Sequence, residues 1–172
     1  MLSSPREGLD PVLHSCVCRE WDEADLIADG FERVYTESAR YDWPRAGLAD
    51  VGGRPHYYDG WAFDRGDDQY VYYVWPASDE AVAWELEWWA IYIAWELRRA
   101  AGEAGVDSHP GHGGINSRYD ELASLLAPHR QIPEKKRKLL AERRLDNRDG
   151  FRAGDTGMWF RWHSSEDADA GE

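Results

Sequence analysis

Two pairs of cysteine and histidine residues contain the side chains that zinc prefers. Zinc in proteins is held by four sulfur or nitrogen ligands in a tetrahedron. The chain has a Cys-x-Cys pair, preceded by His14, and a His-x-x-His pair in a loop rich in glycine and proline. The four candidates for a metal site are therefore Cys16, Cys18, His109 and His112. Both spacings differ from those of most zinc sites, so we favour buried thiols and exposed loop histidines, with no metal and no other cofactor.

Three aspartates in one short segment, Asp64, Asp67 and Asp68, are the other candidates for metal binding or acid–base chemistry. Carboxylates bind divalent cations and exchange protons, but acidic residues in a turn are more often only solvated. The sequence contains no nucleophile elbow, no phosphate-binding loop, no dinucleotide fingerprint and no His-Glu-x-x-His motif. A small enzyme with its site near these aspartates, or near His109 and His112, is therefore kept as an alternative, without a nucleophile that can be named.

Basic side chains are concentrated between Arg130 and Arg152, where nine stand against four acids and give a local charge of +5. Pro133 suits the first position of a helix, so we predict a basic helix within residues 133–148. Such a helix would attract an acidic protein or a nucleic-acid backbone, and the alternative is that it neutralises acidic surface of its own chain. The predicted partner-binding residues are Lys135, Lys136, Lys138, Arg143 and Arg144.

A long tryptophan-rich helix is predicted from Asp79 to about Gly102, because Ser78 can cap its N-terminus and acidic residues follow in its first turn. At 100° per residue its apolar side chains fall into two opposed stripes. The aliphatic stripe contains Val82, Leu86, Trp89, Ile93 and Leu97, and the aromatic stripe contains Trp84, Trp88, Ile91 and Trp95. Two stripes indicate a helix covered on both sides by its own chain. The alternatives are an interface with a partner or second copy, since tryptophan is enriched at binding hot spots, and a ligand groove.

Residues 55–63 and 69–75 are rich in β-forming residues and flank the turn-forming segment 64–68, which predicts an antiparallel hairpin. Both faces of the second strand are apolar or aromatic, as expected of a sheet packed on both sides. The alternative, an aromatic platform that stacks bases or sugars, needs cationic neighbours, whereas the neighbours here are aspartates. Weaker patterns predict a strand at 11–18, a helix at 21–29 capped by Asp22, and a strand within 31–43.

These patterns together predict an α+β fold. A short antiparallel sheet built around the hairpin 55–75 is expected to pack on the long helix 79–102, because strands precede helices in the chain. Two shorter helices, at 118–127 and 134–145, and a C-terminal strand at 158–162 follow. Residues 1–10 are expected to be a flexible arm, residues 11–163 a single domain, and residues 164–172 a disordered acidic tail.

The composition describes a strongly acidic chain of 172 residues with a formal net charge of −13, long enough to bury one core. Arginine outnumbers lysine 17 to 3, which indicates a GC-rich coding sequence and so a bacterial or viral source. The closely spaced cysteines suit a reducing compartment, and neither an export signal nor a membrane span is recognised, so a cytoplasmic location is expected.

The function expected from these features is binding rather than catalysis. The sequence contains no recognised reaction motif, but it has many aromatic residues, and its basic residues are concentrated in one segment of an acidic chain. We therefore expect a small cytoplasmic interaction protein that binds a protein partner, of the inhibitor, immunity or assembly-factor type. The alternatives are a nucleic-acid-associated protein that uses the basic segment, and the small enzyme described above.

Overall fold

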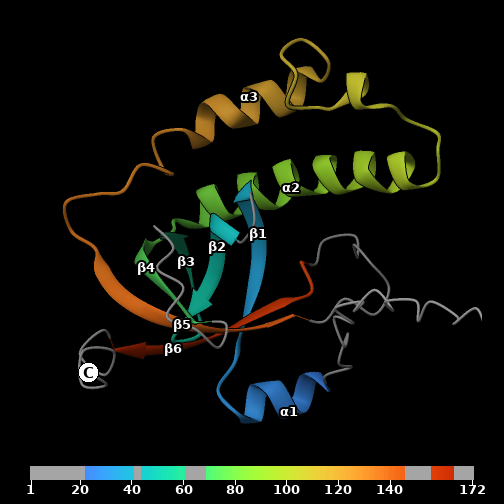
Figure 1. Cartoon of the computed structure of the whole chain (residues 1–172). Coiled ribbons are helices and arrows are strands. Elements are labelled where there is room, and N and C mark those ends of the chain that lie inside the picture. Colours follow the sequence, from blue (N-terminus) through green and yellow to red (C-terminus); the bar gives the residue numbers. More distant parts are fainter. Residues whose placement is uncertain (1–21, 41–43, 61–68, 146–155, 165–172) are drawn as a thin grey trace, which may run out of the picture.

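The computed structural model describes residues 22–40, 44–60, 69–145 and 156–164. Within these residues six antiparallel strands form a closed barrel in which neighbours in the sequence are neighbours in space (Figure 1). The barrel closes because β1 pairs with β2 on one side and with β6 on the other. The strands are β1 Glu32–Arg40, β2 Pro44–Val51, β3 Arg54–Asp59, β4 Gln69–Pro76, β5 Arg137–Leu145 and β6 Met158–Ser164.

The turn between β2 and β3 shows how local sequence sets the register. Gly52 and Gly53 have φ values of 62° and 72°, a left-handed conformation that glycine adopts at little cost. The Glu32 carboxylate, at the start of β1, accepts hydrogen bonds from both glycine N–H groups at 3.1 and 2.6 Å. This contact links the β2–β3 turn to the strand on the other side of β2.

Successive side chains of each strand point alternately into and out of the barrel, and the inward-pointing ones fill its interior. In β4, Tyr70, Tyr72 and Val74 are buried within the barrel core. The rings of Tyr58, Tyr72 and Phe160 meet there, with centroid separations of 5.2 to 5.5 Å. A barrel of so few strands has room inside only for side chains, so a ligand site must lie elsewhere.

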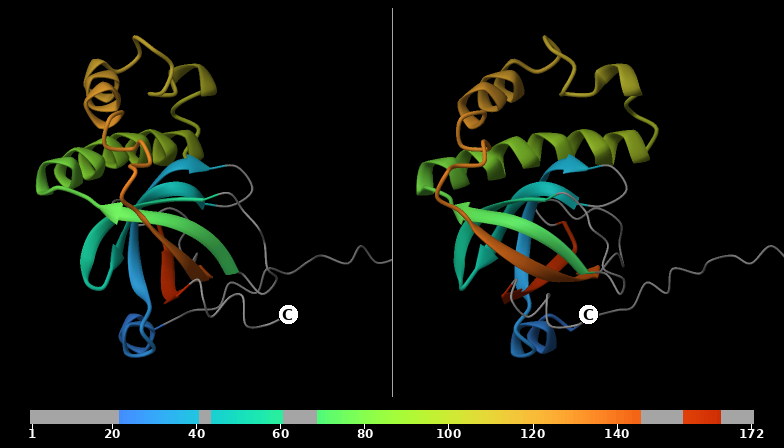
Figure 2. Two further views of the ribbon diagram at one scale, coloured as in Figure 1. Left: turned by 90° about the vertical axis from the view of Figure 1, so that its left-hand side faces the viewer. Right: turned by 60° about the vertical axis from the view of Figure 1, so that its left-hand side comes forward.

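Two helices and a short 3-10 turn are inserted between β4 and β5: α2 Asp79–Ala100, η1 Val106–Ser108 and α3 Ser117–Leu126. Ser78 caps α2 by accepting a hydrogen bond from the N–H of Ala81 at 3.2 Å, as predicted, and Asn116 caps α3 in the same way. Figures 1 and 2 show α2 lying across one end of the barrel, with α3 beyond it on the side away from the strands. This helical hairpin brings α2 against β1.

The opposite end of the barrel carries the short helix α1, Glu23–Ala28 (Figure 1). Asp22 caps it by accepting from the N–H of Ala24 at 2.8 Å, which confirms the helix predicted at 21–29. Leu26 packs with Phe31 and with Trp159 of β6 in a small cluster separate from the barrel core. The helix therefore packs beside Trp159, a residue of the strand pair that closes the barrel.

The predicted fold class is wrong in two respects. The hairpin of residues 55–75 is not an open sheet on a helix, because β3 and β4 are two neighbours in a closed barrel. The segment expected to form a helix at 134–145 contains instead β5, Arg137–Leu145, which pairs with β4 and β6 on its two sides. Its Leu, Lys, Arg and Glu residues favour helix in isolation, but hydrogen bonding along both edges, burial of Ala141 and packing of Leu139 against the core favour the strand.

Several expectations concern residues that lie outside the described ranges: the strand at 11–18, the N-terminal arm and most of the acidic tail. Where the structure is described, α2 is too polar to cross a membrane, and no other helix is long and apolar enough.

Candidate functional site

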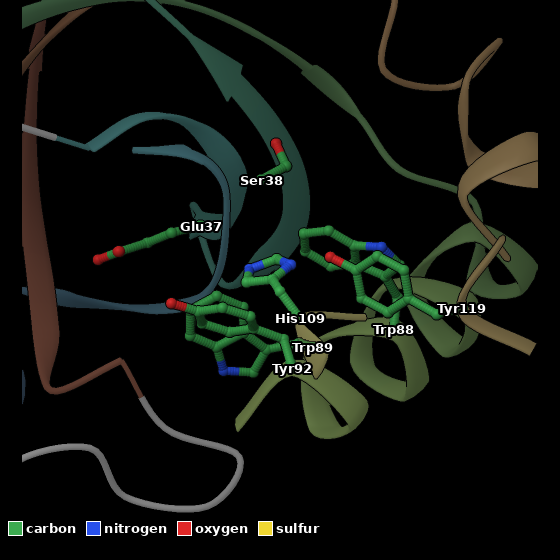
Figure 3. A pocket seen from close by; sticks show the side chains of 7 residues that line it. All are labelled: Glu37, Ser38, Trp88, Trp89, Tyr92, His109 and Tyr119. Carbon is green, nitrogen blue, oxygen red and sulfur yellow. The ribbon is translucent and has the colours of Figure 1, made fainter. Parts of the chain in front are cut away.

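A cavity of about 170 Å³ lies where the helical hairpin meets β1. Two residues of β1 line it on the barrel side, and side chains from α2, α3 and the segment after η1 line it on the other (Figure 3). The lining residues are Glu37, Ser38, Trp88, Trp89, Tyr92, His109 and Tyr119. Five of these seven side chains are aromatic rings, so the walls of this aromatic pocket are mostly apolar.

The rings of the aromatic pocket are held by one another. Trp88 stacks on Tyr119 with their centroids 5.1 Å apart and their planes inclined by 28°, and the Arg130 guanidinium lies over Trp88 at 4.3 Å. Tyr92 lies 5.3 Å from Trp89 and 5.8 Å from His109, centroid to centroid. Tyr119 and Arg130 thus both lie against the Trp88 ring.

His109 is the group in the aromatic pocket that can gain or lose a proton near neutral pH. Its Nδ1 accepts a hydrogen bond from the Gly111 N–H at 2.9 Å, so the neutral ring carries its proton on Nε2. Burial and the nearby His112 lower the pKa of His109, against an opposing contribution from Glu96. At pH 7 the imidazole is therefore uncharged and has an N–H to donate.

Two buried indole groups in the pocket wall lack an acceptor. The Nε1 atoms of Trp88 and Trp89 are shielded from solvent and have no hydrogen-bond partner among the described residues. Leaving a buried N–H without an acceptor costs about 1–3 kcal/mol. The Tyr119 hydroxyl points toward the His109 ring, whereas the Glu37 carboxylate extends away from that ring (Figure 3). Burial raises the pKa of Tyr119, so its hydroxyl stays protonated.

A buried ion pair fixes the helical hairpin. The Arg130 guanidinium, just after α3, donates two hydrogen bonds to the Glu85 carboxylate of α2, at 2.7 and 2.8 Å. Glu85 is fully buried, and burial together with the Glu85 charge raises the pKa of the neighbouring Tyr57 hydroxyl of β3. The Trp75 Nε1 of β4 donates to the His129 carbonyl at 3.1 Å. The end of α3 is thus held against both α2 and the barrel, which sets the position of Tyr119.

The aromatic stripe predicted from the sequence lies against other parts of the same chain. Trp84 meets His129, Trp88 stacks on Tyr119, and Trp95 lies 4.4 Å from the His109 ring, centroid to centroid. The residues of α2 that are buried run between the two predicted stripes, and they are Ala81, Glu85, Trp88, Trp89, Ile93 and Glu96. Leu86 and Leu97 of the aliphatic stripe are exposed.

The metal and acid–base candidates are only partly described. Cys16, Cys18 and the aspartates Asp64, Asp67 and Asp68 lie outside the described residues. His109 and His112 come together, with ring centroids 5.5 Å apart. Within the four described ranges, no group of three or more histidine, cysteine or acidic side chains is placed to hold a metal ion.

The basic segment is a connector and a strand, so the helical spacing expected for its side chains is wrong. Lys135, Lys136 and Lys138 are exposed, and the Lys136 ammonium lies 5.3 Å from the Tyr73 ring. Arg143 lies over Tyr70 at 5.1 Å. Arg144 pairs with Glu142 at 2.6 Å and lies over Phe31 at 5.1 Å. The five predicted residues therefore divide into three exposed lysines and two arginines engaged with their own chain.

The sequence pointed to Trp88 and His109, but it gave no reason to include Ser38, Glu37 or Tyr119. These residues belong to β1 and α3, whose proximity to α2 depends on barrel closure and on the chain reversal after α2. Comparison with known proteins adds no relative, since no protein-family model, no curated protein and no solved structure matches the chain.

Proposed function

We propose that the protein acts by binding, and that the molecule it binds enters the aromatic pocket. The observation that carries the proposal is a cavity between two substructures, walled by four tryptophan and tyrosine rings and a neutral imidazole, with a tyrosine hydroxyl directed at that imidazole. Small-molecule sites in proteins have this character: concave and largely apolar, with a few polar groups that fix orientation. A titratable group with a shifted pKa in such a cavity, here His109, further supports a functional site.

The geometry of the pocket favours binding over catalysis. General acid–base chemistry needs a base within hydrogen-bond reach of a reacting group, and nucleophilic chemistry needs a nucleophile beside that base. Among the lining residues, the Glu37 carboxylate points away from His109, and the Ser38 hydroxyl also lies away from that ring (Figure 3). The lining therefore supplies contacts for a ligand rather than an assembled nucleophile and base.

Filling the pocket should abolish ligand binding without unfolding the protein. Ser38→Phe adds a ring at a lining position of β1, where an aromatic residue suits a strand. In a thermal-shift screen of small fragments, compounds that stabilise the wild type are expected to lose at least about tenfold in affinity for Ser38→Phe. Ser124→Phe, on the exposed side of α3, is the matched control and should bind as the wild type does. Equal stabilisation of both variants would place the ligand outside this pocket.

A macromolecular partner is the second candidate. Lys135, Lys136 and Lys138 stand exposed on a chain of net charge −13, with Arg137 between them. A local basic patch of this kind attracts acidic protein surfaces, whereas the net charge of the whole chain opposes binding to a long nucleic acid. The partner would therefore be an acidic protein that docks at the entry to β5.

Reversing the three lysines to glutamate should weaken such docking and leave the fold intact. With polyglutamate as probe, the wild type is expected to bind at low salt, and the triple variant about tenfold more weakly. The matched variant Arg143→Glu should instead lower stability, because Arg143 lies over the buried Tyr70 ring. Wild-type binding that does not weaken as salt is raised, or a triple variant that binds equally well, would contradict this second candidate.

A further inference from the structure

We infer that the aromatic pocket takes a single uncharged aromatic ring that carries one or two oxygen substituents, as a phenol or a pyrimidine does. The inference rests on the proposed function, since it names the chemical class of the bound molecule. It is carried by four properties of the pocket: its volume, its charge, the edges of its rings and the groups that can bond an oxygen.

The volume limits the ligand to one ring. Sites for drug-sized molecules usually measure about 300–1,000 Å³, and this cavity measures about 170 Å³. Its walls are fixed by packing, because Trp88, Trp89 and Tyr119 are each more than nine-tenths buried. A fused ring system or a chain of sugars would therefore need the helical hairpin to move away from β1.

The charge of the pocket argues against ionised ligands. An anion would meet no cationic side chain among the lining residues. A cation would require an acidic group directed at it, but the Glu37 carboxylate extends away from His109 (Figure 3). An uncharged ligand pays a smaller desolvation free energy than an ion when it leaves water for this site.

The ring edges favour an aromatic ligand over an aliphatic one of the same size. An aromatic ring has a negative face and a positive edge, so an edge-to-face arrangement is attractive. Tyr119 and Arg130 lie against the Trp88 ring, and the indole N–H on the edge of that ring has no acceptor among the described residues. A planar ligand placed against that edge offers its own electron-rich face, which a saturated ring lacks. The indole N–H groups of Trp88 and Trp89, which lack an acceptor within the described ranges, also carry partial positive charge. They therefore favour the same electron-rich ligand face.

Oxygen substituents match the polar groups at the pocket. His109 has an Nε2–H to donate, because its Nδ1 is already occupied by the Gly111 N–H. The Tyr119 hydroxyl, directed toward the same ring, can both donate and accept (Figure 3). A phenol hydroxyl or a pyrimidine carbonyl placed between these two groups would satisfy both, whereas an unsubstituted ring would satisfy neither.

The test uses the full chain and follows the indole N–H signals of Trp88 and Trp89 by NMR, assigned with Trp88→Phe and Trp89→Phe. The probes are p-cresol and uracil, with three comparison compounds: cyclohexanol for the saturated ring, p-hydroxybenzoate for negative charge and tyramine for positive charge. We expect p-cresol or uracil to shift both signals, and the comparison compounds to require at least about tenfold higher concentrations. Tyr119→Phe should weaken the preferred probe about tenfold, and Tyr73→Phe, a tyrosine outside the pocket, should not.

The outcomes separate the ligand class from the proposed function. Preference for p-cresol would assign a phenol, including a tyrosine side chain of a partner, and preference for uracil would assign a nucleobase. If cyclohexanol, tyramine or p-hydroxybenzoate shifts the two indole signals equally well or better, the inferred class is wrong, although binding in the pocket stands. If neither p-cresol nor uracil binds and the fragment screen finds no ligand sensitive to Ser38→Phe, both proposals are overturned.

Discussion

Arg130→Met is expected to destabilise the protein by about 3–5 kcal/mol, because it leaves the Glu85 carboxylate buried without its partner. Glu85 is fully buried in α2 and accepts two hydrogen bonds from Arg130. The same substitution removes the guanidinium from above the Trp88 ring. An uncompensated charge at this buried position must draw in water or displace its neighbours, which weakens the junction between helical hairpin and barrel.

Urea denaturation of Arg130→Met, Glu85→Gln and the double variant measures this effect and the coupling between the two residues. The matched control is Arg118→Met, because Arg118 makes a similar two-bond contact with Glu87 on the exposed side of α2. Solvent screens that pair, so its loss should cost much less. If Arg130→Met and Arg118→Met had the same free energy of unfolding, the Glu85–Arg130 ion pair would not be what holds the helical hairpin to the barrel.

The Glu85–Arg130 ion pair also connects the stability of the fold with the shape of the aromatic pocket. Arg130 contacts Trp88, and Trp88 stacks on Tyr119, so a shift of the connector after α3 would displace two lining rings. A variant that folds but loses the ion pair should therefore bind pocket ligands more weakly. Although no residue of the Glu85–Arg130 pair lines the cavity, the pair holds two of its walls in place.

The elements that were predicted correctly are those whose signals are local. Ser78 and the acidic residues after it mark the start of α2, and Asp22 marks the start of α1, because a cap and its first turn are neighbours in sequence. The β-forming residues of 55–63 and 69–75 likewise identified two strands that pair antiparallel as β3 and β4. Each of these structures depends on contacts within a short stretch of chain.

The elements that were missed depend on distant pairing. Residues 137–145 favour helix by composition, but they lie between β4 and β6, from which they are separated by the helical hairpin and by residues 146–157. Barrel closure through β1 and β6 joins Glu32 to Phe160, and no periodicity within either strand signals it. The aromatic pocket has the same origin, since Ser38 and Tyr119 line one cavity only after β1 and α3 are both placed on α2.

Gly47→Ala is expected to cost about 3 kcal/mol or more and to disrupt the pairing of β1 with β2. A Cβ at this position would lie 1.9 Å from the Thr36 carbonyl oxygen and 2.7 Å from the Tyr58 hydroxyl. That hydroxyl donates to the same carbonyl at 3.1 Å, and the Leu48 N–H donates to the Thr36 Oγ1 at 3.1 Å. The methyl group must therefore displace backbone within a buried network, which a rotamer change cannot relieve.

Gly105→Ala is the matched control for this substitution. Nothing lies within 4 Å of a Cβ at Gly105, and its φ of −98° suits any residue, so the variant should be neutral or slightly stabilised. Urea denaturation measures both variants, and the indole N–H signals of Trp88 and Trp89 report the pocket, since Glu37 pairs with Gly47 across the two strands. Because β1 supplies the barrel side of the cavity, Gly47→Ala should also abolish binding of any pocket ligand. A Gly47→Ala variant as stable as the wild type would show that β1 and β2 do not approach as closely as this register requires.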